Sequence, residues 1–409
     1  FGSSHLGSVF PSQFCFSAPP RHGPLMAAGE NHTVLLRSDG QAIAFGHDGS
    51  NRRSIPELPP GVSYVSAAAS YMHTVLIRSD GQAVTCGHIG QGRCSVPELP
   101  DGTTYVAAAA GGQHSVYIRT DGTAVAIGTT RQRQCSVPAL PEGMTYISTA
   151  AQGRHSMLLR SDGWVEAFGY DSDGQCAVPE LPPGVTYTCM ATNNVHTVLV
   201  RSDGVAVAFG SNEENQCDVP TPPEGVTYIG AACGGLHTVL VRSDGKAVAF
   251  GCNSAGQCDV PVAPEGVAYV GAAAGSRYTV LVQSDGKARA FGENRWGQCD
   301  VPPLPPGLSY LIPSHLRTDV VITLHPEQLA PSDVRVKCTG MSGAEVAVLQ
   351  YSTEHDRMPL GEARRVTAGK LGLPVGKVQL VLADGSLLPG TLDSTPLPDI
   401  LAPVLMGRA

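Results

Sequence analysis

Short apolar stretches alternate with polar turns along most of the chain. In one representative stretch, Thr238–Arg242 is apolar and β-branched, Ser243-Asp244-Gly245 follows, and Lys246–Phe250 alternates small and larger side chains. A period of two is typical of strands, and Asp-Gly between two such stretches is typical of a hairpin. The pattern therefore predicts short antiparallel strands and no helix in this part of the chain.

The same pattern recurs in seven copies that are spaced by 41 residues. The hairpin Asp of each copy is Asp39, Asp80, Asp121, Asp162, Asp203, Asp244 and Asp285. A His precedes six of them at His32, His73, His114, His155, His196 and His237, and the seventh copy has Tyr278 there. A Tyr recurs from Tyr64 to Tyr310 and a Cys from Cys94 to Cys299, with Arg53 in place of the Cys in the first copy.

Each copy predicts four strands, which in the sixth are Thr227–Cys233, Thr238–Arg242, Lys246–Phe250 and Cys258–Pro261. Four strands in about 40 residues is the size of a propeller blade. We therefore predict an all-β, seven-bladed β-propeller of 41-residue, four-stranded blades. The Ala- and Gly-rich first strands are expected to line a channel, and the middle strands to fill the space between blades.

The domain organisation follows from where the period begins and stops. We expect an irregular leader at residues 1–23, the propeller with its closing segment at 24–324, a linker at 325–332, and a small α+β domain with its tail at 333–409. Residues 1–29 contain no Asp or Glu, so a remnant of an organelle targeting segment is an alternative to a plain leader. Residues 308–324 resemble the opening of an eighth copy and are expected to seal the ring.

The composition of the chain argues against several classes of function. Charged residues make up 15% of the chain and the net charge is −8, which argues against broad electrostatic capture of nucleic acid. No apolar stretch approaches the length of a membrane-spanning helix. The chain has no nucleophile elbow and no phosphate-binding loop, so we expect no enzyme activity and no cofactor.

The repeat resembles a known family. The matching residues are Gly235-Leu236-His237-Thr238-Val239-Leu240, Ser243-Asp244-Gly245, Ala249-Phe250-Gly251, Gly256-Gln257 and Val260-Pro261. They are similar to the regulator-of-chromosome-condensation repeat, most of all to the compact bacterial type that includes a propeller inhibitor of β-lactamase. The resemblance covers roughly residues 24–313 and implies a seven-bladed propeller.

The family's functions differ, so the fold decides little. The family member that exchanges nucleotide on a small GTPase and docks on chromatin is expected to carry a basic tail. The ultraviolet-B photoreceptor of the family relies on a cluster of Trp. The ubiquitin ligases of the family carry a separate, large catalytic domain. This chain has no basic tail, only two Trp, and no room for such a domain.

The tail after Pro326 predicts a hairpin of Val334–Thr339 with Glu345–Gln350, a helix at Leu360–Leu371 and a strand at Lys377–Leu382. This order resembles ubiquitin, and Val381 falls where ubiquitin has an Ile of its binding patch. Without a terminal Gly-Gly, the domain is not expected to be conjugated to targets.

The repeated His and Cys invite a chemical interpretation. Six His in a ring could bind metal, but one per blade favours a repeated hydrogen bond that locks a strand end. The Cys, also one per blade and without a CxxC pair, are interpreted as reduced, buried thiols, which predicts an intracellular reducing compartment, cytoplasmic or organellar.

The loop after the third strand differs most among the copies. In copies one to three it carries basic residues, namely Arg52, Arg53, Arg93, Arg131 and Arg133. In copies four to seven it carries acidic ones, namely Asp171, Asp173, Glu213, Glu214, Asp218, Asp259, Glu293 and Asp300. This is either sequence drift on a solvated face or a dipolar rim that orients a partner.

These observations lead to two hypotheses of function. The first is a non-enzymatic scaffold, or an accessory subunit of a larger assembly, that binds protein partners through the rim loops. The alternative is a regulatory propeller, either a small-GTPase exchange factor or a substrate adaptor in ubiquitin ligation.

Overall fold

The computed structural model describes residues 24–311 in full and the backbone of five further strands between residues 320 and 388. The chain divides into two compact units, Phe1–Leu316 and Arg317–Ala409. The leader predicted at residues 1–23 lies outside the described residues.

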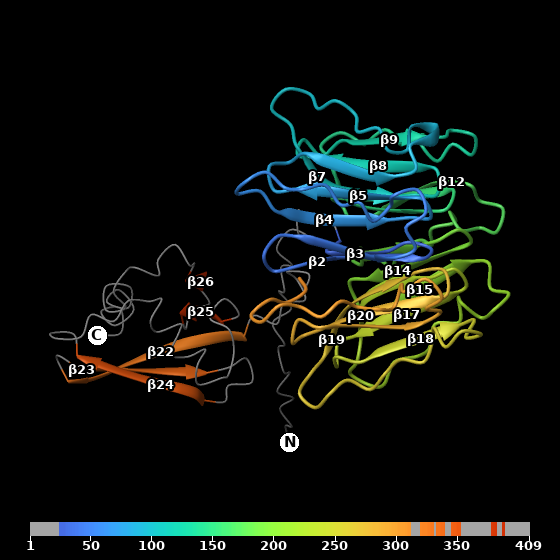
Figure 1. Cartoon of the computed structure of the whole chain (residues 1–409). Helices are drawn as coiled ribbons and strands as arrows, with labels where there is room; N and C mark the ends of the chain where they lie inside the picture. Colours follow the sequence, from blue (N-terminus) through green and yellow to red (C-terminus); the bar gives the residue numbers. More distant parts are fainter. Residues whose placement is uncertain are drawn as a thin grey trace, which may run out of the picture. The chain divides into compact units, whose positions relative to one another are not determined.

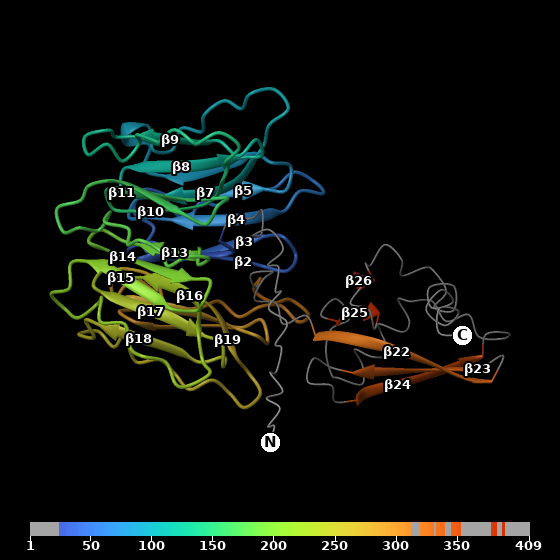
Figure 2. The ribbon, with the colours of Figure 1, turned by 180° about the vertical axis from the view of Figure 1, so that it is seen from behind.

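The first unit is built from seven three-stranded antiparallel sheets that follow one another along the chain (Figures 1 and 2). The first strands are β1 (Met26–Ala28), β4 (Tyr64–Ala69), β7 (Tyr105–Ala110), β10 (Tyr146–Gln152), β13 (Tyr187–Thr192), β16 (Tyr228–Cys233) and β19 (Tyr269–Ala274). The middle strands are β2 (His32–Leu36), β5 (His73–Arg78), β8 (His114–Arg119), β11 (His155–Arg160), β14 (His196–Arg201), β17 (His237–Arg242) and β20 (Tyr278–Gln283). The last strands are β3 (Ala42–Gly46), β6 (Ala83–Gly87), β9 (Ala124–Gly128), β12 (Val165–Gly169), β15 (Ala206–Gly210), β18 (Ala247–Gly251) and β21 (Ala288–Gly292).

The core lies between neighbouring sheets, as a propeller requires. Successive residues of a strand point to opposite faces, so Leu35 packs in one cluster with Val280 of the seventh sheet. Its neighbours Val34 and Leu36 pack in another cluster with Leu76 of the second sheet. The prediction that the middle strands fill the space between blades is confirmed.

The first and seventh blades close the ring through a composite strand. The first strands β1 and β19 contact each other, and their sheets lie side by side in both views (Figures 1 and 2). Tyr310 pairs with Arg37, and the N–H of Leu311 donates to Leu36 at 2.8 Å. In the other blades the residue that corresponds to Tyr310 begins the first strand, for example Tyr64 opposite Arg78. The two ends of the repeat array therefore share one strand of the first blade.

The predicted fourth strand is wrong. The segment at Cys258–Pro261 and its counterparts are irregular, and each blade has three strands. The reason is that its donors are used locally. The N–H of Cys258 donates to the side chain of Asn253 at 2.8 Å, that of Asp259 to Gly256 at 3.1 Å, and that of Val260 to Cys258 at 2.9 Å. Pro261 has no N–H to add to a sheet.

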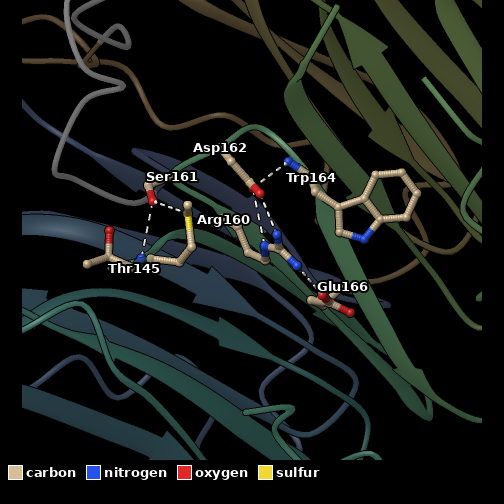
Figure 3. Close-up of polar contacts among 7 residues, drawn as sticks. Thr145, Arg160, Ser161, Asp162, Trp164 and Glu166 are labelled. Carbon is tan, nitrogen blue, oxygen red and sulfur yellow. Dashed lines mark hydrogen bonds and ion pairs between the residues drawn. The ribbon is translucent and has the colours of Figure 1, made fainter. Parts of the chain in front are cut away.

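The Asp-Gly hairpins form as predicted, and in five of the seven blades an Arg two residues before the Asp donates to its carboxylate. Figure 3 shows it in the fourth blade, where the carboxylate of Asp162 accepts from the guanidinium of Arg160 and from the backbone N–H of Trp164. Arg160 also donates to Glu166 at 2.8 Å. In the second and fifth blades, the hydrogen bond from the corresponding Arg holds the pKa of Asp80 and Asp203 below its usual value.

The second unit contains a five-stranded sheet in the order β24-β23-β22-β25-β26. Its strands are β22 (Val320–Ala330), β23 (Asp333–Thr339), β24 (Glu345–Ser352), β25 (Val378–Leu382) and β26 (Leu387–Leu388). β23 and β24 pair where the sequence predicts a hairpin, and Val381 lies in β25.

One strand of the second unit is not predicted by the tail sequence. β22 covers residues that we assigned to the closing segment and the linker. It lies between β23 and β25 in the sheet, antiparallel to β23 and parallel to β25. The predicted helix at Leu360–Leu371 lies outside the described residues. The ubiquitin-like assignment therefore stays a prediction.

A candidate protein-interaction face

The antiparallel strands place two kinds of connection at opposite ends of each blade. One end, the hairpin face, carries the Asp-Gly hairpins and the Pro-rich linkers. The other end, the loop face, carries the turns between the first and middle strands and the loops that follow the last strands. In the first blade the N–H of His47, which opens such a loop, donates to Asn31 of the turn at 2.8 Å. The rim loops singled out in the sequence all belong to the loop face.

The repeated His are structural, as the hydrogen-bond interpretation predicts. Each Nε2 lies within hydrogen-bond distance of a Thr or Ser hydroxyl 42 residues later, in the next blade, as in His32–Thr74 at 2.9 Å and His114–Ser156 at 2.7 Å. That hydroxyl in turn donates to a backbone carbonyl of the preceding blade, as Thr74 does to Arg52 at 2.8 Å. The network therefore links every blade to its neighbour.

Tyr278 completes this network in the seventh blade. Its hydroxyl lies 3.1 Å from Thr33 Oγ1 and donates to the carbonyl of His32 at 2.7 Å. The exception to the His series is thus the residue that joins the last blade to the first. Burial lowers the pKa of the six His to about 3 or 4, so they are neutral in the folded protein.

The repeated Cys and Tyr also serve the architecture. Each Cys thiol donates to a carbonyl six residues earlier, for example Cys135 to Thr129 at 3.2 Å. Burial raises the pKa of Cys135 to about 11, which keeps this donor protonated. Each repeated Tyr donates to the carbonyl of a Pro eight residues earlier, for example Tyr269 to Pro261 at 2.7 Å. The ten Cys whose side chains the structure describes are all free.

Two of the predicted rim residues are not on the surface. Arg93 is 2% exposed and Arg52 is 5% exposed. They occupy the position at which the other five blades have a buried Gln, namely Gln134, Gln175, Gln216, Gln257 and Gln298. Arg52 donates to Gly49 at 2.8 Å and Arg93 to Gly90 at 2.8 Å. Reading these two Arg as exposed rim cations is therefore a mistake, because they fill the junction between blades.

The remaining rim residues lie on the loop face as predicted. Glu293 is half-buried, and the others are exposed, namely Arg53, Arg131, Arg133, Asp171, Asp173, Glu213, Glu214, Asp218, Asp259 and Asp300. Some of them are held within their own loops. Arg53 pairs with Asp48 at 3.7 Å, and Asp218 accepts from Asn212 at 2.8 Å. The charge of Arg53 is therefore partly compensated, and one carboxylate oxygen of Asp218 already has a hydrogen-bond donor.

The strongest charge contrast lies between the third blade and the next two. Arg131 and Arg133 in the third blade are exposed and form no ion pair with any described residue. Exposed carboxylates follow in the fourth and fifth blades, namely Asp171, Asp173, Glu213 and Glu214. Neighbouring blades thus present opposite charges on one face.

Sequence reasoning missed a set of exposed apolar side chains on the loop face. Ile89 is 82% exposed, Trp296 50% and Tyr71 46%. The repeat contained a signal for these three side chains, because each departs from the residues at the equivalent places. The other six copies carry a different residue at each of these places, and Ile89, for example, stands where they have Asp, Thr or Asn.

Two further findings concern the described residues only. They contain no group of three or more His, Cys, Asp or Glu that could hold a metal ion. No helix among them is long and apolar enough to span a membrane.

Comparisons with known proteins agree with the fold. The family model described as the regulator of chromosome condensation (RCC1) repeat matches residues 229–257. A search of curated proteins finds no match.

Several solved propellers have a similar structure. Prp20p from Saccharomyces cerevisiae has a TM-score of 0.53 at 17% identity, covering 63% of this chain and 81% of that chain. Human WBSCR16 has a TM-score of 0.52 at 16% identity, with 67% and 90% covered. The ectodomain of the Physcomitrella patens receptor kinase CR4 has a TM-score of 0.51 at 17% identity, with 65% and 71% covered. At these identities the likeness shows a shared propeller fold, and the repeat match places an RCC1 repeat within the sixth blade.

Proposed function

We propose that the chain is a non-enzymatic binding protein that holds a protein partner on the loop face of its propeller. The observation that carries this proposal is the contrast between Arg131 and Arg133, which are exposed and form no ion pair within the described part of the chain, and the carboxylates of the next two blades. The repeated His, Cys and Tyr are all engaged in holding the blades together. The chemically distinctive groups that remain free are those of the loops.

Electrostatic complementarity of this kind acts mainly on orientation and association rate. A partner with acidic residues facing the third blade and basic residues facing the fourth and fifth would dock in one orientation. Prp20p, whose structure is similar, is described with its binding to Gsp1p and histones, which supports a protein-binding role for this type of propeller.

The proposal is tested by purifying the full chain with its native partners and repeating the purification with Arg131→Glu/Arg133→Glu. We expect the variant to lose the partner or to bind it at least tenfold more weakly at low salt. The matched control is Lys246→Glu/Arg289→Glu, which changes the net charge equally at two exposed residues outside the loops of the loop face, one in a hairpin and one in β21. Equal retention of the partner by both variants would rule out the loop face.

The alternative is a regulatory propeller that accelerates nucleotide release from a small GTPase. A nucleotide-release assay with a panel of small GTPases separates the two. Faster nucleotide release with less than one chain per GTPase would establish exchange activity, and this function would then replace the scaffold proposal.

We also propose that the chain works where thiols stay reduced. Six repeated Cys act as hydrogen-bond donors through S–H, which an oxidised sulfur cannot do. A thiol count in denaturant, before and after reduction, should give the same number. Several intact disulfides in the native protein would contradict this proposal.

A further inference from the structure

Three large apolar side chains of the loop face belong to one side of the ring. Trp296 lies in the seventh blade, and Tyr71 and Ile89 lie in the second, with the first blade between them. They are the three most exposed large apolar residues of this face, and the repeat does not require any of them. Exposed apolar groups that gather in one place are typical of interaction sites.

Contacts through the first blade connect these side chains. The rings of Trp296 and His47 lie edge to face with their centroids 4.4 Å apart. His47 accepts from the N–H of Gly49 at 3.2 Å, and the carbonyl of Gly49 accepts from Arg52 at 2.8 Å. The guanidinium of Arg52 stacks on the ring of Tyr71, 5.8 Å from its centroid. A chain of contacts therefore connects Trp296 to Tyr71 through the first blade.

Ile89 belongs to the same blade as Tyr71. It lies in the loop that is closed by the hydrogen bond of Arg93 to Gly90. Arg93 also contacts the sulfur of Met72 at 2.9 Å, beside Tyr71 in the chain. We call Trp296, His47, Tyr71 and Ile89 together the seam patch.

Buried cations lie next to the seam patch without a matching anion. Neither Arg52 nor Arg93 forms an ion pair with a described residue, although Glu30 and Asp48 attract Arg52 at longer range. Burial lowers the pKa of both guanidinium groups. A buried charge without a paired opposite charge is costly to keep in a folded protein.

The architecture does not need a cation at this position. Gln175 makes the same contact across a blade junction, since its amide donates to Asn194 at 3.2 Å, as Arg93 donates to Gly112 at 3.2 Å. Five blades use Gln here and only the two beside the seam patch use Arg. Their positive charge is thus an additional feature of the first two blades.

We propose that the seam patch binds an extended segment of a partner protein in which apolar anchors are flanked by Asp or Glu. The apolar side chains of the segment would cover Trp296, Tyr71 and Ile89. Its carboxylates would lie in the field of Arg52 and Arg93, which strengthens as water is excluded. This inference rests on the proposed function, since it names the part of the loop face and the chemistry of the partner.

The test uses the full chain and synthetic peptides. The probe is a fluorescein-labelled peptide of repeated Asp-Phe-Glu-Leu units, and its binding is followed by fluorescence anisotropy. Two matched peptides replace either the acidic residues by Lys or the apolar residues by Ser. We expect both to bind at least tenfold more weakly than the probe.

Variants of the chain then locate the site. Trp296→Ala/Tyr71→Ala should weaken probe binding about tenfold, because exposed aromatic residues commonly dominate interface energies. Leu236→Ala is the matched control, since Leu236 is an exposed apolar residue of the same face in the sixth blade. It should leave the affinity unchanged.

Replacing Arg52 and Arg93 distinguishes a role in peptide binding from a role in stability. Arg52→Gln/Arg93→Gln installs the residue of the other blades, and we expect about tenfold weaker probe binding with an equal or higher urea midpoint. A lower midpoint with unchanged affinity would show that the two Arg are structural and would overturn the proposal.

Three other results would also overturn it. These are equal binding of all three peptides, equal binding by Trp296→Ala/Tyr71→Ala and the wild type, or a chain dimer in sedimentation that Trp296→Ala abolishes, which would assign the patch to a second copy. Failure here leaves the proposed function open to its own test, because the rim experiment uses native partners and changes residues outside the seam patch.

Discussion

At the scale of single residues, the repeated positions show how buried polar groups can stabilise a repeat array. Each His is fully buried, yet its Nε2 has a hydroxyl partner in the next blade. A buried polar group with a partner contributes modestly to stability, whereas one without a partner is expensive. The network therefore favours neighbouring blades in one relative position.

The six buried His predict a loss of stability in mild acid. They stay neutral in the folded protein down to a pKa of about 3 or 4, because burial penalises the imidazolium. In the unfolded chain they take up protons below a pKa of about 6.5. Below that pH the unfolded state binds more protons, so stability falls as the pH falls from 6.5 towards 4.

The expected slope is large. Each His contributes about 1.4 kcal/mol per pH unit, and six together about 8 kcal/mol per pH unit. Since domains are stable by about 5–15 kcal/mol, unfolding is expected roughly between pH 6 and pH 5. Urea denaturation from pH 8 downwards measures the slope. His237→Asn should reduce it by about one sixth, and a free energy of unfolding that is constant between pH 7 and pH 5 would contradict the prediction.

At the scale of elements, the sequence predicted what repeats and missed what depends on local hydrogen bonding. The three strands of each blade and the Asp-Gly hairpins follow from alternation and turn chemistry. The fourth strand failed because Asn253 and the turn carbonyls use its donors, which a pattern of apolar residues does not reveal. The burial of Arg52 and Arg93 was missed because charge usually indicates a surface, although the Gln of the other copies was a clue.

The hairpin Gly predict a specific cost of substitution. Gly163 has φ of +84°, and a Cβ there would lie 2.3 Å from Cβ of Thr186 in the linker that follows. Gly184, which lies in the linker before β13 and not in a hairpin, has φ of +76° with no atom within 4 Å of its Cβ position. Gly184→Ala should therefore cost only the backbone penalty of about 1–2 kcal/mol.

Gly163→Ala should cost the same penalty plus about 1–3 kcal/mol for the overlap with Thr186. Urea denaturation of both variants gives the two free energies of unfolding. Equal losses would show that the linker moves aside without cost, and that the hairpin does not fix its position.

At the scale of the whole propeller, the sequence predicted that a segment closes the ring but not which strands pair there. The match of residues 308–310 to an eighth copy indicated a sealing segment. It could not reveal that Tyr310 and Leu311 supply the start of a strand that Met26–Ala28 complete, because pairing between distant segments has no local signal. The exception at Tyr278 belongs to the same junction and was noticed only as a departure from the repeat.

Closure makes the stability of all seven blades depend on contacts between the two ends of the array, one of which is the backbone hydrogen bond from Leu311 to Leu36. Leu311→Pro removes the N–H that donates to Leu36, while Leu311→Ala keeps this N–H and removes only side-chain packing. We expect the Pro variant to be less stable than the Ala variant by about 1–3 kcal/mol, the cost of a lost donor and an unpaired carbonyl.

The number of transitions in the unfolding curve distinguishes a closed ring from an open repeat array. In an open repeat array each unit contacts only its neighbours, so a defect at one end frays that end first. In a ring the first blade is held from both sides. The second blade holds it through Thr74 with His32, and the end of the array holds it through Tyr278 with Thr33 and Leu311 with Leu36. Leu311→Pro should therefore lower the midpoint of a single transition seen by both circular dichroism and tryptophan fluorescence. An early separate phase, with the midpoint of the rest unchanged, would show that the blades unfold as an open array.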